Sequence, residues 1–587
     1  MTRLSCAGLL AAVVWQSAGF ASDPAGSTDF VRHAADAYWE VYLQRYPTFA
    51  TAIGEHRWDH KLEDLGEPAR QQWLNTVRQF LERVRSVPAD HLPEADRLNR
   101  TVLERVMLDE LDRVDSPQNL MPLDPLYGAH LRLPLLLVSQ PLNDAGDFRA
   151  YVARLLEFPR QVDELIAAMR RGWESGIVAP LPIVEKVLVQ LRLQAVDDPE
   201  KCELYAAKEV QRLPEPEREE AQSAIRVAVS AHVVPAYRRL LAFVDEEYRP
   251  RARQTVGLST LPGGAAWYER LVRRHTTLPL SADDVHELGL REVARLRQEM
   301  SAVQQQVGFE GTLDQFQAHM RTDPRHRFDS ADALYTAADE ILQRTKPRLS
   351  SLFGRLPRAD CVMRRIESFR APAAPVAYYN AAAPDGSRPG YYYINTYEPG
   401  ERLRFTLEAL TYHEAVPGHH LQFALDQENT ELPAYRRHAS FTAYVEGWAL
   451  YAEKLGYEIG GYSEPSDRYG QLTFEMWRAC RLVVDTGLHH KGWSRSEAIN
   501  FMAGNTSLAP LDIEAEVDRY ITWPGQALAY KVGELHILDL RARARRRLGD
   551  RFDLRAFHDA LLAGGAMPLD LLEARMETWM EGQLAPP

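Results

Sequence analysis

Cysteine and long apolar runs are scarce in this chain of 587 residues, and its 69 basic residues are outnumbered by 82 acidic ones. The net charge of -13 argues against a nucleic-acid partner, because nucleic-acid binding requires a basic surface. No persuasive G-x-S-x-G elbow, P-loop or dinucleotide fingerprint is present, and no internal repeat is visible. The cysteines are Cys6, Cys202, Cys361 and Cys480. They are too widely spaced for a disulfide framework or a C-x-x-C motif, but their number allows one isolated disulfide.

Residues 1–21 have the pattern of an export signal. Arg3 supplies a positive start, residues 9–15 form an apolar run that is too short to span a bilayer, and the small residues around 19–21 match a cleavage site. The alternative is an ordinary mobile N-terminus. No later segment is apolar enough to predict a membrane helix. We therefore expect a periplasmic or secreted protein that is not inserted in a membrane once the signal has been removed.

Apolar residues recur at helical spacing through most of the chain, and 45% of its residues are hydrophobic, which is enough for a large core. One such stripe runs from Trp73 to Val84. Further stripes cover the segments 148–173, 218–245, 281–306 and 331–345. Prolines and glycines separate these stripes rather than interrupt them, so the pattern predicts a mainly α protein with a large helical body.

Strand signal is confined to residues 376–380 and 391–395, which flank a turn-rich loop. We predict a small β-sheet or hairpin there, next to the helices that carry the metal ligands described below. Such a sheet could hold an extended peptide by strand addition or could simply cover the core. A polar run at 249–253 predicts a boundary near residue 250. It divides the chain into an N-terminal helical region (22–250) and a C-terminal catalytic region (251–587). The two regions either share one hydrophobic core or have one each.

The segment 413–420, with the sequence HEAVPGHH, carries the strongest chemical signal. It begins with the His-Glu pair of a zinc peptidase helix, but in H-E-x-x-H the second histidine follows the first by four residues. On a straight helix His419 would face away from His413, and His420 would lie about 10.5 Å further along the axis. Proline must break or bulge the helix here, and glycine tolerates the backbone angles of a bulge. A bulge of two residues makes His419 the second ligand with His420 as its neighbour, whereas a bulge wider by one makes His420 the ligand.

A third ligand is expected from the segment 443–453, in which two acids seven residues apart lie on one helical face. We predict that Glu446 binds the metal and that Glu453 orients a histidine. The aromatic neighbours indicate a buried helix, where an acid needs a partner such as a cation. The alternative is an exposed or salt-bridged glutamate beside core histidines. Three such donors and one open position suit catalytic Zn²⁺, and Glu414 is then the general base.

These motifs resemble a known family. The segments 413–422, 446–453 and 524–531 are similar to the bacterial family called domain of unknown function 885, which is grouped with the zincin metallopeptidases, and 46–51 and 261–264 also fit. The resemblance covers nearly all of the chain after the signal. It implies a mostly helical, secreted or periplasmic protein with a gluzincin-like site. The helix around Glu446 is also similar to the third-ligand helix of the thimet oligopeptidase group.

Peptide hydrolysis places negative charge on the former carbonyl oxygen, which requires a hydrogen-bond donor. Tyr530 is the first candidate for this donor, and zincin oligopeptidases likewise use a tyrosine from a late segment; Tyr520 is the reserve. Arg481 lies in an apolar stretch from Met476 to Leu488 that also contains Arg478, Asp485 and His489. Arg481 could bind a substrate terminus, since arginine grips carboxylates with two parallel bonds, or it could belong to a structural ion-pair network.

We therefore predict a zinc-dependent metallopeptidase that hydrolyses short peptides with a metal-activated water. One alternative keeps the zinc but acts as an amidase or esterase on a non-peptide substrate. Another is a non-catalytic protein that binds a ligand at a metal site, although a pure binder has no need of Glu414. A di-iron helical protein is not favoured, because it requires Glu-x-x-His pairs on facing helices.

Overall fold

The computed structural model describes residues 24–137, 139–366, 371, 374–382 and 388–585. The predicted export signal and Cys6 therefore lie outside the described residues. The other three cysteines, Cys202, Cys361 and Cys480, are buried and free.

Helices make up most of the described chain, which confirms a mainly α protein with a small sheet. The N-terminal helices are α1 Pro24–Arg45, α2 Pro47–Ala52, α3 Glu67–Arg85, α4 Glu94–Val114, α5 Arg132–Leu136, α6 Ala145–Glu174, α7 Leu181–Gln194, α8 Ala207–Val210, α9 Glu217–Ala228 and α10 Val234–Ala242. The middle helices are α11 Gly264–Thr276, α12 Ala282–Gln306, α13 Leu313–Thr322 and α14 Ala331–Thr345. The C-terminal helices are α15 Leu407–Glu414, α16 His419–Glu428, α17 Ala434–His438, α18 Thr442–Leu455, α19 Pro465–His489, α20 Arg495–Asn505, α21 Pro510–Thr522, α22 Ala529–Leu548, α23 Leu554–Leu562 and α24 Leu569–Leu584.

The predicted periodic segments lie in helices. Segments 148–173, 281–306 and 331–345 fall within or next to α6, α12 and α14, and 218–245 runs from α9 through α10 by way of π-helical turns. On α3, Trp73, Leu74, Val77, Leu81 and Val84 are buried, as the apolar stripe predicts.

Among the described residues, one continuous helical segment, Glu217–Arg251, is long and apolar enough to cross a bilayer by length and composition. The prediction that no later segment is apolar enough for a membrane helix is therefore wrong for this segment by length and composition. Half of its most apolar window is buried inside the protein. It packs on α6 and α7, so its environment is that of a core helix.

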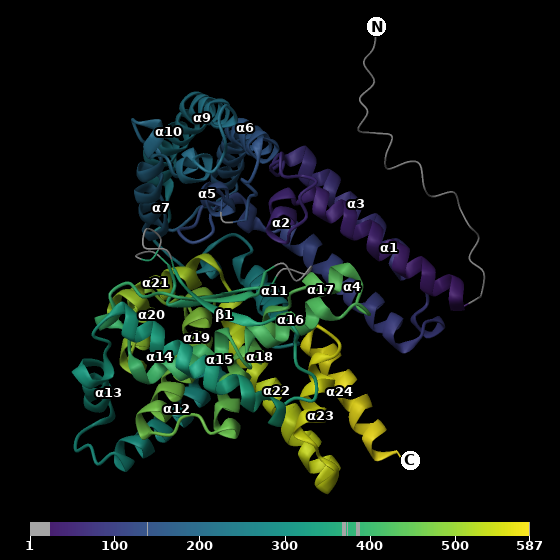
Figure 1. The fold of residues 1–587 in the computed structure, drawn as a ribbon, viewed down its shortest axis with the longest axis vertical. Coiled ribbons are helices and arrows are strands. Elements are labelled where there is room, and N and C mark those ends of the chain that lie inside the picture. The colour runs from purple at the N-terminus through teal and green to yellow at the C-terminus, as the bar shows by residue number, and fades with distance from the viewer. Residues whose placement is uncertain (1–23, 138, 367–370, 372–373, 383–387, 586–587) are drawn as a thin grey trace.

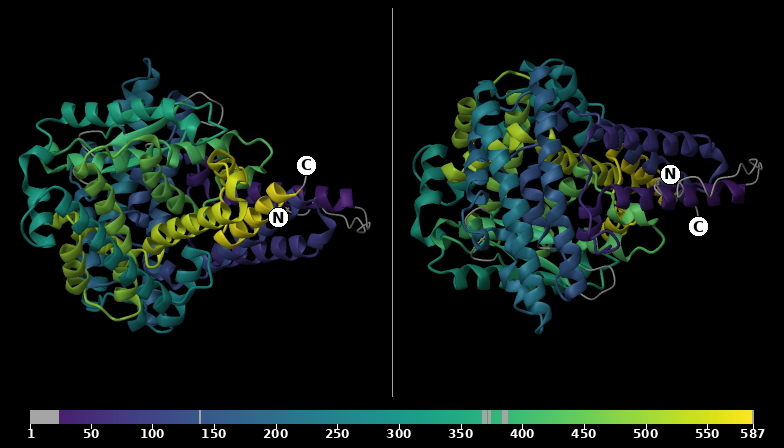
Figure 2. Two further views of the ribbon diagram at one scale, coloured as in Figure 1. Left: turned by 90° about the horizontal axis from the view of Figure 1, so that it is seen from below. Right: turned by 90° about the horizontal axis from the view of Figure 1, so that it is seen from above.

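Helices α5–α10 form one end of the molecule, and the C-terminal helices form the larger body beside it (Figure 1). Helices α1, α3 and α4 extend along one side. Both views in Figure 2 show the C-terminal helices next to these N-terminal ones, and an ion pair between Arg105 and Asp570 joins α4 to α24.

Buried apolar side chains form three large clusters. The first joins α1, α3 and α4 to α11, α14, α18 and α22–α24, the second fills α6–α10, and the third lies around α12, α19 and α21. Residues 22–250 thus fill most of the second cluster, share the first with the C-terminal region and contribute Ile183 to the third. The division near residue 250 stays a prediction.

The sheet has three strands in the order β1-β3-β2: β1 Cys361–Arg365, β3 Gly390–Ile394 and β2 Ala377–Asn380. The antiparallel pair β2–β3, with Tyr379 opposite Tyr392, is the predicted hairpin, and most of its loop lies outside the described residues. Strand β1 pairs in parallel with β3 and was not predicted. It is short, and two of its five residues are arginines, so its sequence gives little strand signal.

Candidate metal centre

The two predicted histidine ligands lie on consecutive helices rather than on one bulged helix. Helix α15 ends at Glu414, and α16 begins at His419. A Cβ atom at Gly418 would lie 2.3 Å from the carbonyl oxygen of Tyr412 and 2.0 Å from that of His413, so only glycine allows the chain to turn back so tightly. The Trp448 indole of α18 donates to the Pro417 carbonyl at 3.0 Å and ties this turn to the helix of the third ligand.

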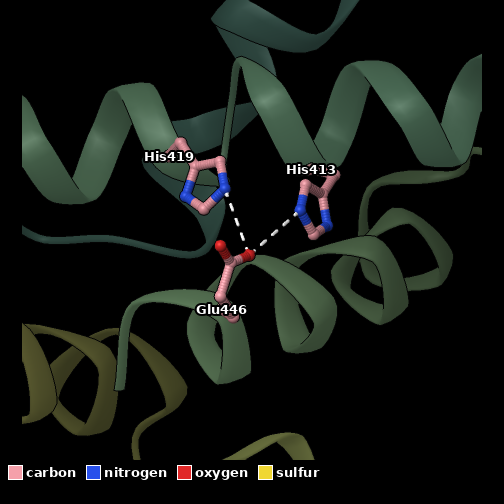
Figure 3. Close-up of side chains that lie close together, drawn as sticks. All are labelled: His413, His419 and Glu446. Carbon is pink, nitrogen blue, oxygen red and sulfur yellow. Dashed lines mark ion pairs between the residues drawn. The ribbon is translucent and has the colours of Figure 1, made fainter. Parts of the chain in front are cut away.

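His413, His419 and Glu446 bring their donor atoms together, and we call these three residues the metal centre. Glu446 Oε2 lies 3.6 Å from His413 Nε2 and 3.5 Å from His419 Nε2. Figure 3 shows both imidazoles pointing toward this carboxylate. Zinc bonds of about 2.0–2.2 Å in a tetrahedron give donor–donor edges of about 3.3–3.6 Å. The two distances from Glu446 therefore fit one zinc ion, and all three donor atoms lie within 4.8 Å of one another.

The polar atoms of the metal centre also favour a cation. Glu446 Oε2 is buried and, among the described residues, has no hydrogen-bond partner. Burial by itself lowers the pKa of His413, but the carboxylates of Glu446, Glu453 and Glu414 raise it to about 9. Burial raises the pKa of Glu446, yet its two histidines hold it well below the usual range. Without metal, the centre therefore attracts a proton, and a divalent ion would satisfy the same negative charge.

Glu453 lies directly behind the first histidine. Its Oε1 accepts a hydrogen bond from His413 Nδ1 at 2.8 Å, and its side chain is fully buried. This bond leaves Nε2 of the imidazole free to face Glu446. Arg478 approaches the same Glu453 oxygen at 3.7 Å. The arrangement is that of a carboxylate that orients a metal-binding histidine.

His420 lies outside the metal centre. Its Nδ1 is 3.0 Å from the Tyr379 hydroxyl on β2, and its Nε2 is 3.1 Å from the Ala359 carbonyl. Burial lowers its pKa to about 4, so the ring is neutral at pH 7. A Cβ at Gly390 of β3 would lie 2.6 Å from His420 Nδ1, so this glycine lets the ring fit against the sheet. His420, the alternative ligand, therefore forms a packing contact between α16 and the sheet.

Glu414 is the last residue of α15, next to His413, and is partly exposed. The side chains of the metal centre are 4% exposed for His413, 10% for His419 and 18% for Glu446. Glu414 thus supplies a carboxylate next to the metal centre that is not one of its three donors.

Tyr530 reaches this region because α18 and α22 pack unusually closely. A Cβ at Gly533 would lie 1.9 Å from the Ala443 carbonyl and 2.7 Å from the Cα of Gly447, so both helices require glycine at the crossing. Burial and the Glu446 carboxylate raise the pKa of Tyr530, which keeps its hydroxyl protonated. The charge of Glu446 thus acts on this tyrosine, and the guanidinium carbon of Arg481 lies 4.4 Å from the centre of its ring.

The hydroxyl of Tyr520, the second candidate for the oxyanion donor, is already hydrogen-bonded to other side chains. Its hydroxyl donates to Glu516 at 2.7 Å and accepts from Trp477 Nε1 at 3.1 Å and Arg481 Nε at 3.0 Å. Tyr520 therefore belongs to a buried network beside Tyr530.

Sequence reasoning missed two charged residues of this network, Glu516 and Arg519 on α21. Arg519 donates to Glu516 at 2.9 Å and to Gln526 at 2.7 Å. Their spacing of three residues on a helix is a pairing signal, but nothing in the sequence says that this pair faces Arg481.

Comparisons with known proteins agree on a family and a fold. A family model described as a bacterial protein of unknown function (DUF885) matches residues 47–576. The crystal structure of a candidate lipoprotein from Colwellia psychrerythraea is 27% identical, with a TM-score of 0.89, and the match covers 96% of this chain and 100% of that one. A candidate lipoprotein of unknown function from Shewanella oneidensis is 19% identical, with a TM-score of 0.70 and coverage of 93% and 99%. No curated protein matches the chain.

Proposed function

Because the chain belongs to the bacterial DUF885 family, whose function is unknown, we propose a function from the metal centre: a zinc-dependent metallopeptidase that hydrolyses short peptides. The observation that carries this proposal is the convergence of His413, His419 and Glu446 on spacings that suit one tetrahedral ion, beside a carboxylate that is not one of the donors. The same donor set supports membership of the zincin metallopeptidases.

A zinc ion in this centre supplies a Lewis acid that polarises a carbonyl group and makes water acidic near neutral pH. The protein's own groups do the rest. Glu414 accepts a proton from the attacking water and passes it to the leaving amine. Glu453 holds His413 in one tautomer by accepting from its Nδ1. Tyr530, protonated and close to Glu446, donates to the oxygen on which negative charge develops.

The limited exposure of the centre supports short substrates. Its three side chains are at most 18% exposed, so an extended chain reaches them more easily than a folded surface does. The candidate-lipoprotein descriptions of the two solved relatives support a periplasmic or secreted location for this chain as well.

Glu414→Gln tests the proposal. The amide keeps the size of the side chain but cannot accept the proton, so we expect hydrolysis of a peptide library to fall by about 10²–10⁴. Bound zinc, measured by elemental analysis, should stay near one ion per chain. Glu431→Gln, at an exposed residue after α16, is the matched control and should keep full activity.

Three outcomes separate the proposal from its alternatives. Chelator-sensitive peptide cleavage that is lost in Glu414→Gln supports the peptidase. Bound zinc with turnover only of small amides or esters supports a hydrolase of non-peptide substrates. Bound zinc without any hydrolysis supports a binding protein, and absence of zinc overturns the metal centre itself.

A further inference from the structure

Three buried arginines lie beside the metal centre and have too few carboxylate partners. We call Arg478, Arg481 and Arg519 the arginine cluster. Arg481 and Arg519 share one carboxylate, Glu516, at 3.0 Å and 2.9 Å. Arg478 approaches Glu453 at 3.7 Å. One positive charge of the cluster is therefore left over among the described residues.

The cluster is rigid and held by aromatic rings. The guanidinium carbons of Arg478 and Arg481 lie 4.4 Å and 4.5 Å from the centre of the Trp477 ring. Arg481 Nε donates to the Tyr520 hydroxyl, and its Nη1 is buried without a hydrogen-bond partner among the described residues. The side chain of Arg481 is only 4% exposed. A charge held so far from water and only partly paired is costly unless an anion compensates it.

The cluster contacts two residues assigned above to the surroundings of the metal centre, Glu453 and Tyr530. Arg478 contacts the Glu453 oxygen that also binds His413. The guanidinium carbon of Arg481 lies 4.4 Å from the centre of the ring of Tyr530, the tyrosine proposed above to donate to the developing negative charge. The surplus charge thus lies against the ring of this tyrosine.

The open side of the cluster lies at Arg519, whose side chain is 12% exposed, and at the partly buried Tyr530. Arg519 is held in place by Gln526, three residues before the helix that carries Tyr530. Arg519 and Tyr530 are therefore the most accessible parts of this region, and Arg481 is joined to both, by its contact with the Tyr530 ring and by the shared Glu516.

We propose that the arginine cluster binds a substrate carboxylate close to the scissile bond, so that the enzyme removes short pieces from the carboxyl end of peptides. This inference rests on the proposed function. Guanidinium groups suit the role, because they match a carboxylate with paired, charge-assisted hydrogen bonds.

The experiment uses three synthetic pentapeptides of one sequence. The first ends in a free carboxylate, the second in a carboxamide, and the third is a carboxamide with glutamate as its last residue. Binding is measured by calorimetry on the zinc-loaded Glu414→Gln protein, and hydrolysis on the otherwise native protein. We expect the first peptide to exceed the second by roughly tenfold or more in affinity and in kcat/KM, the value of one charge-assisted hydrogen bond.

Arg481→Gln and Arg519→Gln should bring the ratio of the first peptide to the second close to one. Arg481→Lys should leave an intermediate ratio, because it keeps the charge but loses the paired guanidinium donors. Arg249→Gln, which removes an exposed pair with Glu185, is the matched control and should leave the ratio unchanged. A purely structural role for the cluster would lower the values for both peptides and keep their ratio, so the ratio separates recognition from folding.

Each outcome supports or overturns the inference. If the third peptide behaves like the first, the cluster recognises an acidic side chain as well as a terminal carboxylate; if it behaves like the second, only the terminus is recognised. Equal values for all three peptides, or no binding of any, overturn the inference. Carboxylate-selective binding without hydrolysis by the native protein would keep the arginine cluster as a carboxylate site and reject the peptidase proposal.

Discussion

Around helices α5–α10, two buried tyrosines donate to backbone carbonyls, whereas near the metal centre buried charged side chains pair with one another. Tyr151 donates to the Leu204 carbonyl at 2.6 Å, and Tyr237 donates to the His130 carbonyl at 2.9 Å. Near the centre, Lys531 instead contacts Glu475 at 2.6 Å and Glu534 at 2.7 Å, and all three side chains are at most 1% exposed.

This difference indicates what each region needs. A hydroxyl that donates to a carbonyl fixes a loop at little cost, because both groups are neutral. A buried ion pair loses much hydration energy and is often no better for stability than apolar residues. We infer that α12, α18, α19 and α22 keep their buried charges to hold Glu446, Glu453 and Tyr530 in place, while α5–α10 act as support.

The strongest test of this comparison replaces Glu446 of the metal centre and, as a reference outside it, the buried Glu110 of α4. Glu446→Gln should abolish zinc binding and activity, because an amide oxygen is a much poorer ligand than a carboxylate. Glu110→Gln changes a glutamate that is 5% exposed and bonds to Tyr46, Trp73 and Arg113, so it should lower stability but keep the zinc. Elemental analysis and thermal melting measure both effects. Zinc retained in Glu446→Gln would remove this residue from the metal centre.

Arg154→Met should destabilise the protein by about 3–5 kcal/mol without loss of zinc. Arg154 is fully buried and donates to the carbonyls of Lys61, Pro47 and Trp58, which would be left without this donor. Urea unfolding and zinc content are the measurements. Arg239→Met, which removes an exposed pair with Asp163, should cost less than about 1 kcal/mol. Loss of zinc in Arg154→Met would contradict a purely supporting role.

The same contrast explains how much could be predicted from the sequence. The helical stripes and the metal donors depend on spacings within a segment, so His413, His419, Glu446 and Glu453 could be named from helix geometry and ligand chemistry. Whether the turn at Pro417 is a bulge or a break depends on contacts with Trp448, which local spacing does not reveal.

Features that depend on distant segments could not be predicted. The role of His420 follows from its position against β2 and the small Gly390 of β3. Strand β1 is defined by parallel pairing with a strand that begins 25 residues after it ends. The sharing of Glu516 by Arg481 and Arg519 requires α19 to pack on α21.

Asp485→Asn tests whether buried charge near the metal centre costs stability. Burial raises the pKa of Asp485 to about 7, although bonds from Tyr268 and the Gly525 amide oppose this shift. Between about pH 4 and pH 7 the folded protein keeps a proton that the unfolded chain releases, so stability falls as the pH rises. The asparagine variant lacks this loss. We expect its stability relative to the native protein to rise by about 2–3 kcal/mol from pH 5 to pH 8.

Denaturant unfolding at both pH values measures this difference. If the difference in unfolding free energy between Asp485→Asn and the native protein does not change with pH, Asp485 does not titrate in this interval. Asp485 would then not be an example of a buried charge that costs stability.

The smallest expected effects come from removing one neutral hydrogen bond in each region. Tyr151→Phe should cost about 1 kcal/mol and leave zinc affinity unchanged, since its hydroxyl only holds the Leu204 carbonyl. Trp448→Phe removes the donor to the Pro417 carbonyl and should cost about 1–2 kcal/mol. It should also weaken zinc binding by about tenfold, as changes behind metal ligands do, because the turn between the two histidines is freed. Competition with a zinc-binding dye measures the affinity. If both variants lose stability but keep equal zinc affinity, the turn is held by its own backbone, and Gly418 rather than Trp448 sets the distance between His413 and His419.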